Sequence, residues 1–148
     1  ANPCGDCRDV RRTRAAAGAR VGHSRVVSTA PHLEIGRAAE AAAARYLERM
    51  GYQVLQNNFR ARGGELDVVA VDGAALAIVE VRYRASDRFG GGAASITADK
   101  RRRIIRAARA LLATQPLLAR LPARFDVVEV SGPADALDCH LIRGAFSV

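Results

Sequence analysis

The stretch from Gly63 to Arg84, GGELDVVAVDGAALAIVEVRYR, constrains the fold of this chain more than any other. Two short runs rich in β-branched residues flank the turn signal Asp72-Gly73, which together predict a β-hairpin. A four-residue turn over 72–75 would pair Val71 with Leu76, and a two-residue turn would shift this register but keep the same side chains on each face. The rest of the chain is therefore expected to pack around a pair of antiparallel strands.

The same register brings charged side chains together on one face of the hairpin. Asp67 lies opposite Glu80, and Glu65 lies opposite Arg82. Directly opposed side chains are about 5 Å apart at Cβ, where like charges destabilise a sheet unless something neutralises them. A divalent metal ion is one neutralising group, and salt bridges to Arg82 and Arg84 are another.

The bulk composition indicates one globular domain with an anionic partner. The chain has 148 residues, which is long enough to bury a core without disulfides or metals. Hydrophobic residues make up 49% of it, yet no apolar run is long enough for a transmembrane helix. The net charge of +8 favours nucleic acid as the partner, and without a spanning run we expect no membrane partner.

The N-terminal segment, residues 1–33, differs in composition from the rest. It contains six arginines and two aspartates and no sustained apolar period, so we expect a basic, disordered arm. A salt-sensitive tether for nucleic acid is the alternative interpretation. The segment has no apolar region typical of a secretory signal, and the three cysteines form no disulfide framework, which predicts a cytoplasmic location. Residues 34–148 then form the folded domain, as a monomer or a homodimer.

Hydrophobic periodicity predicts one α/β domain built of helices and strands. Thr97 is a good N-cap for the second helix. Residues 59–64 and 85–93 are expected to be loops, the second of them glycine-rich. The expected order is a helix over 34–50, a strand over 52–56, the hairpin strands over 68–71 and 76–81, a helix over 98–114, a helical turn over 117–121, and strands over 124–130 and 137–142.

The second helix carries an unusual concentration of positive charge. Its buried stripe is predicted to contain Ile104, Ala108 and Leu111, with the cations on the opposite side. Those cations are Lys100, Arg101, Arg102, Arg103, Arg106 and Arg109. Like charges at these spacings repel one another, so we interpret Arg102, Arg106 and Arg109 as a ridge that follows phosphates, with a solvated face as the alternative.

The element order and motifs resemble two known groups of proteins. The first is the restriction-endonuclease-like nucleases, the PD-(D/E)xK superfamily. Asp67 matches the first acidic position of that superfamily, and Glu80-Val81-Arg82 matches its (D/E)xK motif. More closely, residues 34–148 resemble the YraN-like family of small uncharacterised bacterial proteins. The matching positions are Gly36, Glu40, Tyr46-Leu47, Gly51-Tyr52, 63–73, 79–84, 88–92, 95–97, Lys100 and 124–128.

The superfamily resemblance implies a mixed sheet flanked by helices. It also implies hydrolysis of phosphodiester bonds, in DNA ahead of RNA, with Mg²⁺ or Mn²⁺. Asp67 and Glu80 would hold the metal ion, as hard cations prefer, with the carbonyl of Val81 as a third ligand. Glu40 corresponds to an additional acidic ligand of some branches of the superfamily. Glu65, on the same strand face as Asp67, is a candidate to support the ligands without binding the ion itself. Arg82 replaces the lysine of the motif; because arginine stays protonated, it can stabilise a phosphate but cannot be a general base.

Two functional hypotheses follow. The first is a metal-dependent DNA endonuclease, with branched recombination or repair intermediates among its candidate substrates. The second is a DNA-binding protein without catalysis, in which salt bridges neutralise the acidic residues. An interaction domain with no role in nucleic-acid binding is a third alternative. In the first two, the predicted nucleic-acid contacts are Arg84, Arg88, Lys100, Arg102, Arg106 and Arg109.

Overall fold

A computed structural model of the chain describes residues 30–85 and 96–148. The element order is the predicted one, which confirms the α/β, restriction-endonuclease-like fold class. The elements are α1 (Ala30–Arg49), β1 (Gln53–Ala61), β2 (Gly64–Asp72), β3 (Ala75–Arg84), α2 (Ala98–Thr114), the 3-10 turn η2 (Leu118–Arg120), β4 (Ala123–Ser131) and β5 (Asp138–Phe146). Among the described residues, no helix is long and apolar enough to cross a membrane.

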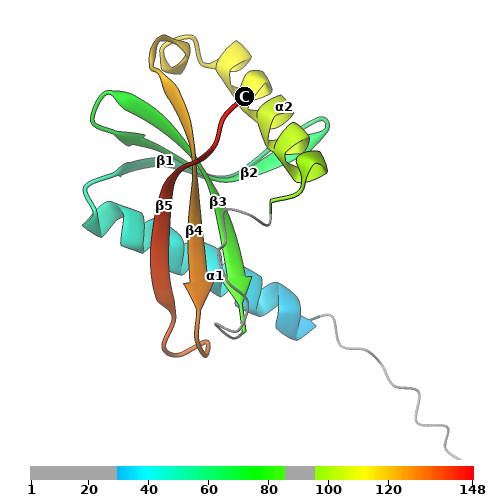
Figure 1. Ribbon diagram of the computed structural model, residues 1–148, viewed down its shortest axis with the longest axis vertical. Helices are drawn as coiled ribbons and strands as arrows, with labels where there is room; N and C mark the ends of the chain where they lie inside the picture. The colour runs from blue at the N-terminus through cyan, green and yellow to red at the C-terminus, as the bar shows by residue number, and fades with distance from the viewer. Residues whose placement is uncertain (1–29, 86–95) are drawn as a thin grey trace, which may run out of the picture.

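The five strands form one mixed sheet in the order β1-β2-β3-β4-β5. All neighbours are antiparallel except β3 and β4, which are parallel. Parallel neighbours need a long connection, and α2 lies on it. The sheet twists strongly, so that β1 and β2 run across the direction of β4 and β5 in Figure 1.

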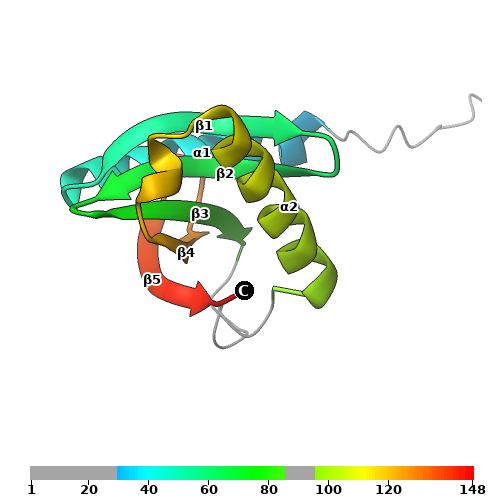
Figure 2. The ribbon, with the colours of Figure 1, turned by 90° about the horizontal axis from the view of Figure 1, so that it is seen from above.

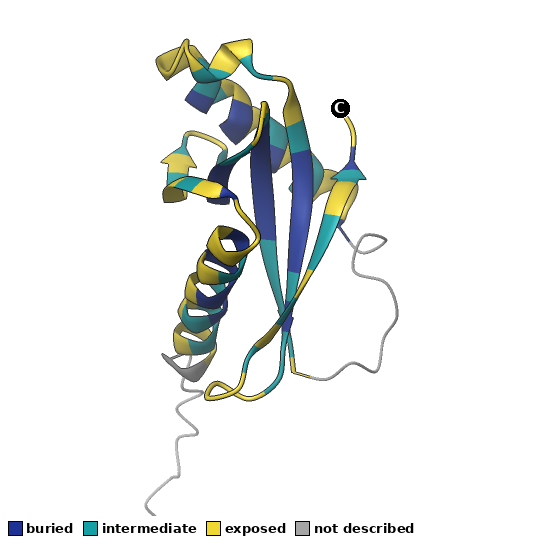
Figure 3. Ribbon diagram, turned by 90° about the vertical axis from the view of Figure 1, so that its left-hand side faces the viewer, coloured by how far each residue is buried: buried dark blue, intermediate teal, exposed yellow. Residues whose placement is uncertain are grey.

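Each face of the sheet is covered by one helix. On one face, Ala39, Ala43 and Leu47 of α1 pack on a cluster that includes Val68 and Val79. On the other, the apolar stripe of α2 packs on a second cluster, drawn from β2, β3, β4 and β5. Figures 1 and 2 show α1 and α2 on opposite sides of the strands, and Figure 3 shows that burial is greatest in the central strands. The core therefore has two layers separated by the sheet.

Several predicted element boundaries are wrong. The first helix begins at Ala30, so the last residues of the predicted arm belong to α1. Strand β1 continues to Ala61, through part of the segment predicted to be a loop. β1 is an edge strand with mostly exposed side chains, so hydrophobic periodicity could not reveal its length. Residues 1–29, which contain most of the predicted arm, and 86–95, which contain Arg88, lie outside the described residues.

The predicted hairpin register is confirmed from the turn to the Val68–Val79 pair, whereas the predicted pairs Asp67–Glu80 and Glu65–Arg82 lie beyond the regular ladder. Val71 pairs with Leu76, and the adjacent pair Asp72–Ala75 closes the turn. The regular pairing of β2 with β3 extends as far as Val68 and Val79 and ends there. Beyond this pair the two strands are not joined by a regular ladder.

A buried charge network joins β2, β4 and β5 at the end of the sheet near the β2–β3 turn. Asp126 is fully buried, and its carboxylate accepts hydrogen bonds from Arg124 Nε at 2.8 Å and from the Gly144 amide at 2.9 Å. Arg124 also donates to Asp72 at 2.8 Å and to the Tyr52 hydroxyl at 3.0 Å. The Arg124 hydrogen bond holds the pKa of Asp72 below its ordinary value of 3.8. A charge in the interior is tolerated here because it is paired.

Replacing Arg124 should destabilise the domain far more than replacing its neighbour Arg143. Arg124→Met leaves the buried Asp126 carboxylate without its cation, which typically costs about 3–5 kcal/mol. Arg143→Met is the matched control, because Arg143 is exposed and lies 3.7 Å from Asp72, where an ion pair contributes about 1 kcal/mol or less. Urea unfolding measures both free energies. Equal losses of unfolding free energy in the two variants would show that the buried network contributes no more to stability than the exposed ion pair of Arg143.

Helix α2 approaches β2 so closely that one position admits only glycine. A Cβ on Gly64 would collide with the backbone carbonyl of Arg103 and lie 3.2 Å from the Ala107 side chain. Because backbone atoms cannot rotate away, any larger residue must push α2 from the sheet. Gly64 therefore fixes the distance between the helix and the start of β2.

We expect Gly64→Ala to lower the free energy of unfolding by about 1–3 kcal/mol, the usual cost of overpacking. Gly36→Ala, in α1, is the control, because no atom lies within 4 Å of its added Cβ. That change should leave stability unchanged or raise it by about 0.5–1 kcal/mol. Chemical denaturation of both variants checks this. A Gly64→Ala protein as stable as Gly36→Ala would show that α2 is not held at this contact.

Candidate functional site

Asp67 lies where β2 and β3 part. Leu66 and Val69 belong to the same core cluster although they are three residues apart, so the alternation of side chains is interrupted at Asp67. Asp67 is 9% exposed, and its carboxylate accepts a hydrogen bond of 2.8 Å from the amide of Val81. An amide of β3 that would otherwise pair with β2 thus holds the carboxylate in the gap.

Glu80, on β3, faces Asp67 across this gap. It is also 9% exposed, and its Oε1 atom forms an ion pair of 3.1 Å with Lys100 Nζ of α2. Its buried Oε2 atom has no hydrogen-bond donor among the described residues. Burial, and next the charge of Asp67, raise the pKa of Glu80 to about 7.

The two carboxyl groups are electrostatically coupled. Burial raises the pKa of Asp67 as well, although the Val81 amide and Lys100 oppose that shift. When Glu80 is protonated its carboxyl donates to Asp67, which is why their hydrogen bond raises the pKa of Glu80 and lowers that of Asp67. When both are ionised, two negative charges share a buried gap with one ammonium group. Such a pair binds either a proton or a cation.

Lys100 occupies a position that the sequence interpretation missed. It was predicted to lie with the arginines on the side opposite the buried stripe, and this is wrong. Its side chain is 33% exposed and points to Glu80. The sequence did contain the signal: Lys100 precedes the buried Ile104 by four residues, so the two share a helical face. Burial alone would lower the pKa of Lys100, but the charges of Glu80 and Asp67 outweigh it and the pKa is raised.

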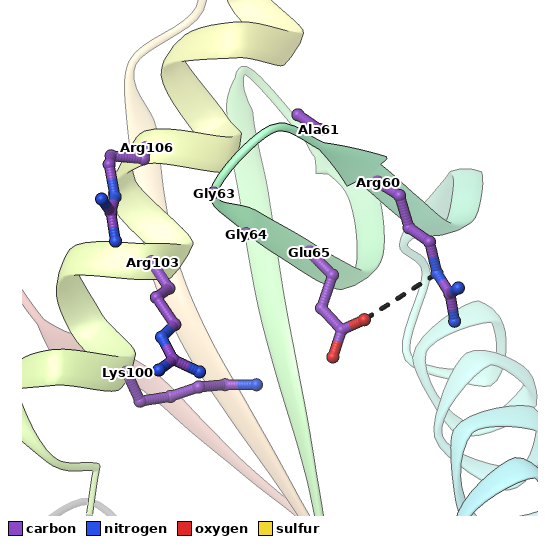
Figure 4. A pocket seen from close by; sticks show the side chains of 8 residues that line it. All are labelled: Arg60, Ala61, Gly63, Gly64, Glu65, Lys100, Arg103 and Arg106. Atoms are coloured by element: carbon purple, nitrogen blue, oxygen red, sulfur yellow. Dashed lines mark ion pairs between the residues drawn. The ribbon is translucent and has the colours of Figure 1, made fainter.

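Beside the carboxylate pair is a cavity of about 540 Å³ between α2 and the β1–β2 hairpin. Its charged lining groups are Arg60, Glu65, Lys100, Arg103 and Arg106. Figure 4 shows Lys100 and Arg103 extending from α2 beside the hairpin, with Arg60 on the far side of Glu65. Arg60 and Arg103 were not among the predicted contacts, because their proximity depends on how α2 docks.

The other two predicted acidic residues, Glu40 and Glu65, lie near Asp67, between α1 and the β1–β2 hairpin. Glu40, Glu65 and Asp67 line a second cavity of about 470 Å³, together with residues at the start of α1. The charge of Glu40 contributes to the raised pKa of Asp67. The Arg60–Glu65 ion pair, 3.8 Å long, borders both cavities.

The remaining predicted residues are distributed around the site. Arg84 lies 3.6 Å from Glu129, and Arg82 and Arg84 both interact with neighbouring groups. The predicted ridge is divided: Arg106 lines the larger cavity, Arg102 pairs with Asp99 at 3.3 Å, and Arg109 is exposed. Their contacts with nucleic acid stay predictions.

The donor set fits a hard cation through two carboxylates. Within residues 30–85 and 96–148, no three or more His, Cys, Asp or Glu side chains are grouped closely enough to hold a metal ion. Mg²⁺, however, is usually bound through one or two carboxylates, with water and substrate phosphate completing its shell. The orphaned Oε2 of Glu80 and the raised pKa values of both carboxyls are what such an ion would relieve.

Comparison with known proteins gives a consistent family relationship. Residues 39–130 match the model of the uncharacterised protein family UPF0102. A UPF0102 protein of Xanthomonas euvesicatoria pv. vesicatoria is 54% identical over 111 residues, which are 75% of this chain and 89% of that protein. A UPF0102 protein of Xylella fastidiosa is 47% identical over 113 residues, 76% of this chain and 92% of that protein.

Glu80→Gln should stabilise the metal-free protein at pH 8. Folding raises the pKa of Glu80 from 4.5 to about 7. Above pH 4.5 this carboxyl loses its proton more readily in the unfolded state than in the folded state, which lowers the free energy of unfolding. The loss is complete above about pH 7. A neutral isostere removes up to about 3 kcal/mol of that penalty at pH 8 and nothing at pH 4. Thermal melts in EDTA at both pH values measure the difference.

The control for this prediction is Glu48→Gln, on an exposed position of α1, which should not change the melting temperature. Adding Mn²⁺ at pH 8 should raise the melting temperature of the wild-type protein, since a ligand that binds only the folded state stabilises it. The same addition should have little effect on Glu80→Gln. A lower melting temperature for Glu80→Gln in EDTA at pH 8 would show that Glu80 is a stabilising charge.

Proposed function

The chain belongs to the uncharacterised protein family UPF0102, and we propose that it is a metal-dependent nuclease that hydrolyses phosphodiester bonds in DNA. The observation that carries the proposal is the buried Asp67–Glu80 pair with Lys100 at 3.1 Å from Glu80. Burial raises the pKa of both carboxyls, so ionising this pair is costly to the fold, and such costs are concentrated at functional sites. Two carboxylates and one lysine match the parts that the superfamily resemblance implies.

Asp67 and Glu80 would hold Mg²⁺ or Mn²⁺, with the carbonyl of Val81 as a further ligand. The ion, when bound, supplies an activated water and neutralises charge on the phosphate. Asp67 is kept in place by the Val81 amide, so its carboxylate is oriented before anything binds. Glu40 is placed on the α1 side of Asp67, where it would orient the attacking water or a second ion.

We assign the role of the motif lysine to Lys100. The position two residues after Glu80 is Arg82, yet an ammonium group reaches Glu80 from α2 instead. Because the pKa of Lys100 is raised, it stays protonated at neutral pH and is not a general base. It would bind a non-bridging phosphate oxygen or stabilise the leaving oxyanion. Arg82 would assist as a second phosphate contact, a role that a permanently charged guanidinium can fill.

The decisive experiment is cleavage of single-stranded, duplex and branched DNA, and of RNA, with Mg²⁺ or Mn²⁺. We expect metal-dependent products on DNA that Glu80→Gln abolishes, and the stability of that variant excludes unfolding as the cause. Cleavage by Glu80→Gln would assign the activity to a contaminant. Tight DNA binding with no cleavage under either metal would favour the alternative, a binding protein on the same fold.

Lys100→Met should lower kcat by about 100-fold or more, the usual loss when a positioned charge at a phosphate is removed. Arg45→Met, which removes an exposed arginine on α1 away from the site, is the control and should leave kcat unchanged. Single-turnover cleavage separates the chemical step from binding. If Lys100→Met retained the wild-type rate while Glu80→Gln did not, the assignment of the motif lysine to Lys100 would be wrong.

A further inference from the structure

The cavity between α2 and the β1–β2 hairpin is an unusual concentration of like charge. Arg60 from β1 and Lys100, Arg103 and Arg106 from α2 surround it, against the single carboxylate of Glu65. We propose that this cavity is a phosphate subsite, which holds a backbone phosphate of the DNA strand next to the one at the Asp67–Glu80 pair. The inference rests on the proposed function and specifies how its substrate is held.

The cavity adjoins the carboxylate pair through a shared residue. Lys100 lines the cavity and also forms the ion pair with Glu80. Glu65, on the opposite wall, is separated from Asp67 by one residue of β2. A strand whose phosphate contacts Lys100 at the carboxylates therefore has its neighbouring phosphate at the cavity.

Between Ala61 and Glu65, the hairpin wall of the cavity includes two glycines, Gly63 and Gly64, which present bare backbone. Gly63 has φ +95°, a conformation that glycine adopts readily, and an added Cβ there would lie 3.7 Å from the Arg106 guanidinium. Gly64 packs directly on the Arg103 carbonyl and also has no side chain to fill the space. The two glycines thus keep the cavity open and bring β1 within reach of α2.

The three arginines around the cavity are weakly neutralised, whereas Lys100 is paired with Glu80. Arg60 and Glu65 are exposed and 3.8 Å apart, and Arg103 pairs with an exposed carboxylate, Asp99, at 3.0 Å. Exposed pairs of this kind contribute little, so an incoming anion can displace them at small cost. For Arg106, the described residues provide no ion pair or hydrogen bond.

The chemistry of the lining favours a phosphate. Three of the four cations are arginines, whose planar guanidinium groups bind two phosphate oxygens at once. The cavity offers no large apolar surface for a base to stack on, since its non-charged lining residues are Ala61, Gly63 and Gly64. Contacts limited to the backbone carry no sequence information, so the subsite predicts sequence-independent binding and a requirement for a substrate with a flanking phosphate.

The test is binding of a fluorescein-labelled single-stranded DNA 12-mer in EDTA, followed by anisotropy across a series of salt concentrations. Arg60→Gln, Arg103→Gln and Arg106→Gln should each weaken binding about tenfold, the typical loss of a hydrogen bond to a charged group. Each should also reduce the slope of log K against log salt by about 1. Arg120→Gln removes the same charge from the exposed end of η2 and should change neither quantity.

Three results would overturn the subsite: no binding by the wild-type protein at low salt, losses with Arg120→Gln equal to those with Arg106→Gln, or a loss restricted to the α2 arginines that spares Arg60→Gln. Thermal melts confirm that each variant is folded. Because EDTA excludes cleavage, the outcome is independent of the nuclease assay. If the protein binds DNA as predicted but never cleaves it, the subsite is supported and the proposed nuclease function is wrong. If it cleaves DNA but these variants do not change binding, the nuclease function is supported and the subsite is wrong.

Discussion

The candidate site depends on the parting of β2 and β3 beyond the Val68–Val79 pair. If regular pairing continued, the Val81 amide would bond to backbone and no space would exist between the strands. Where pairing ends, that amide binds the Asp67 carboxylate instead, and Glu80 enters the same gap. The twist of a sheet that has one helix on each face makes this divergence possible. The site is thus a gap between two strands whose pairing has ended, and the surrounding packed core maintains that gap.

The sheet holds two groups of buried charge that differ in how far they are satisfied. The Asp126 carboxylate, on β4, is satisfied by Arg124 and by the Gly144 amide. Asp67 and Glu80 have one ammonium group between them; burial raises the pKa of both, and the charge of Asp67 raises that of Glu80 further. A fully satisfied network stabilises a fold, whereas an unsatisfied one retains the capacity to bind a ligand. The domain thus contains one buried charge network that is satisfied by its own side chains and one that is not.

Local signals predicted the elements and the register, but tertiary docking decided the site. The Asp72-Gly73 turn fixed the pairing of Val71 with Leu76, and the Thr97 cap fixed the start of α2, because both depend on neighbouring residues alone. The role of Lys100 was missed because its charge groups it with the arginines, although its spacing of four residues from Ile104 places it on the buried face of the helix. Arg60 and Arg103 carry no shared pattern in the sequence; they meet only because Gly64 lets α2 approach. The Arg124–Asp126 network likewise joins distant strands, which periodicity cannot detect.

The contact between Gly64 and the Arg103 carbonyl has a mechanical consequence. Backbone atoms in contact cannot change rotamer, so the interface between α2 and the sheet yields little at this point. A helix held at one stiff point rotates about it, and displacement grows with distance along the axis. Lys100 and Arg103 are close to the pivot, whereas Leu111 lies two turns further along. Changes in core volume near Leu111 would therefore tilt the far end of the helix while the charged end keeps its position.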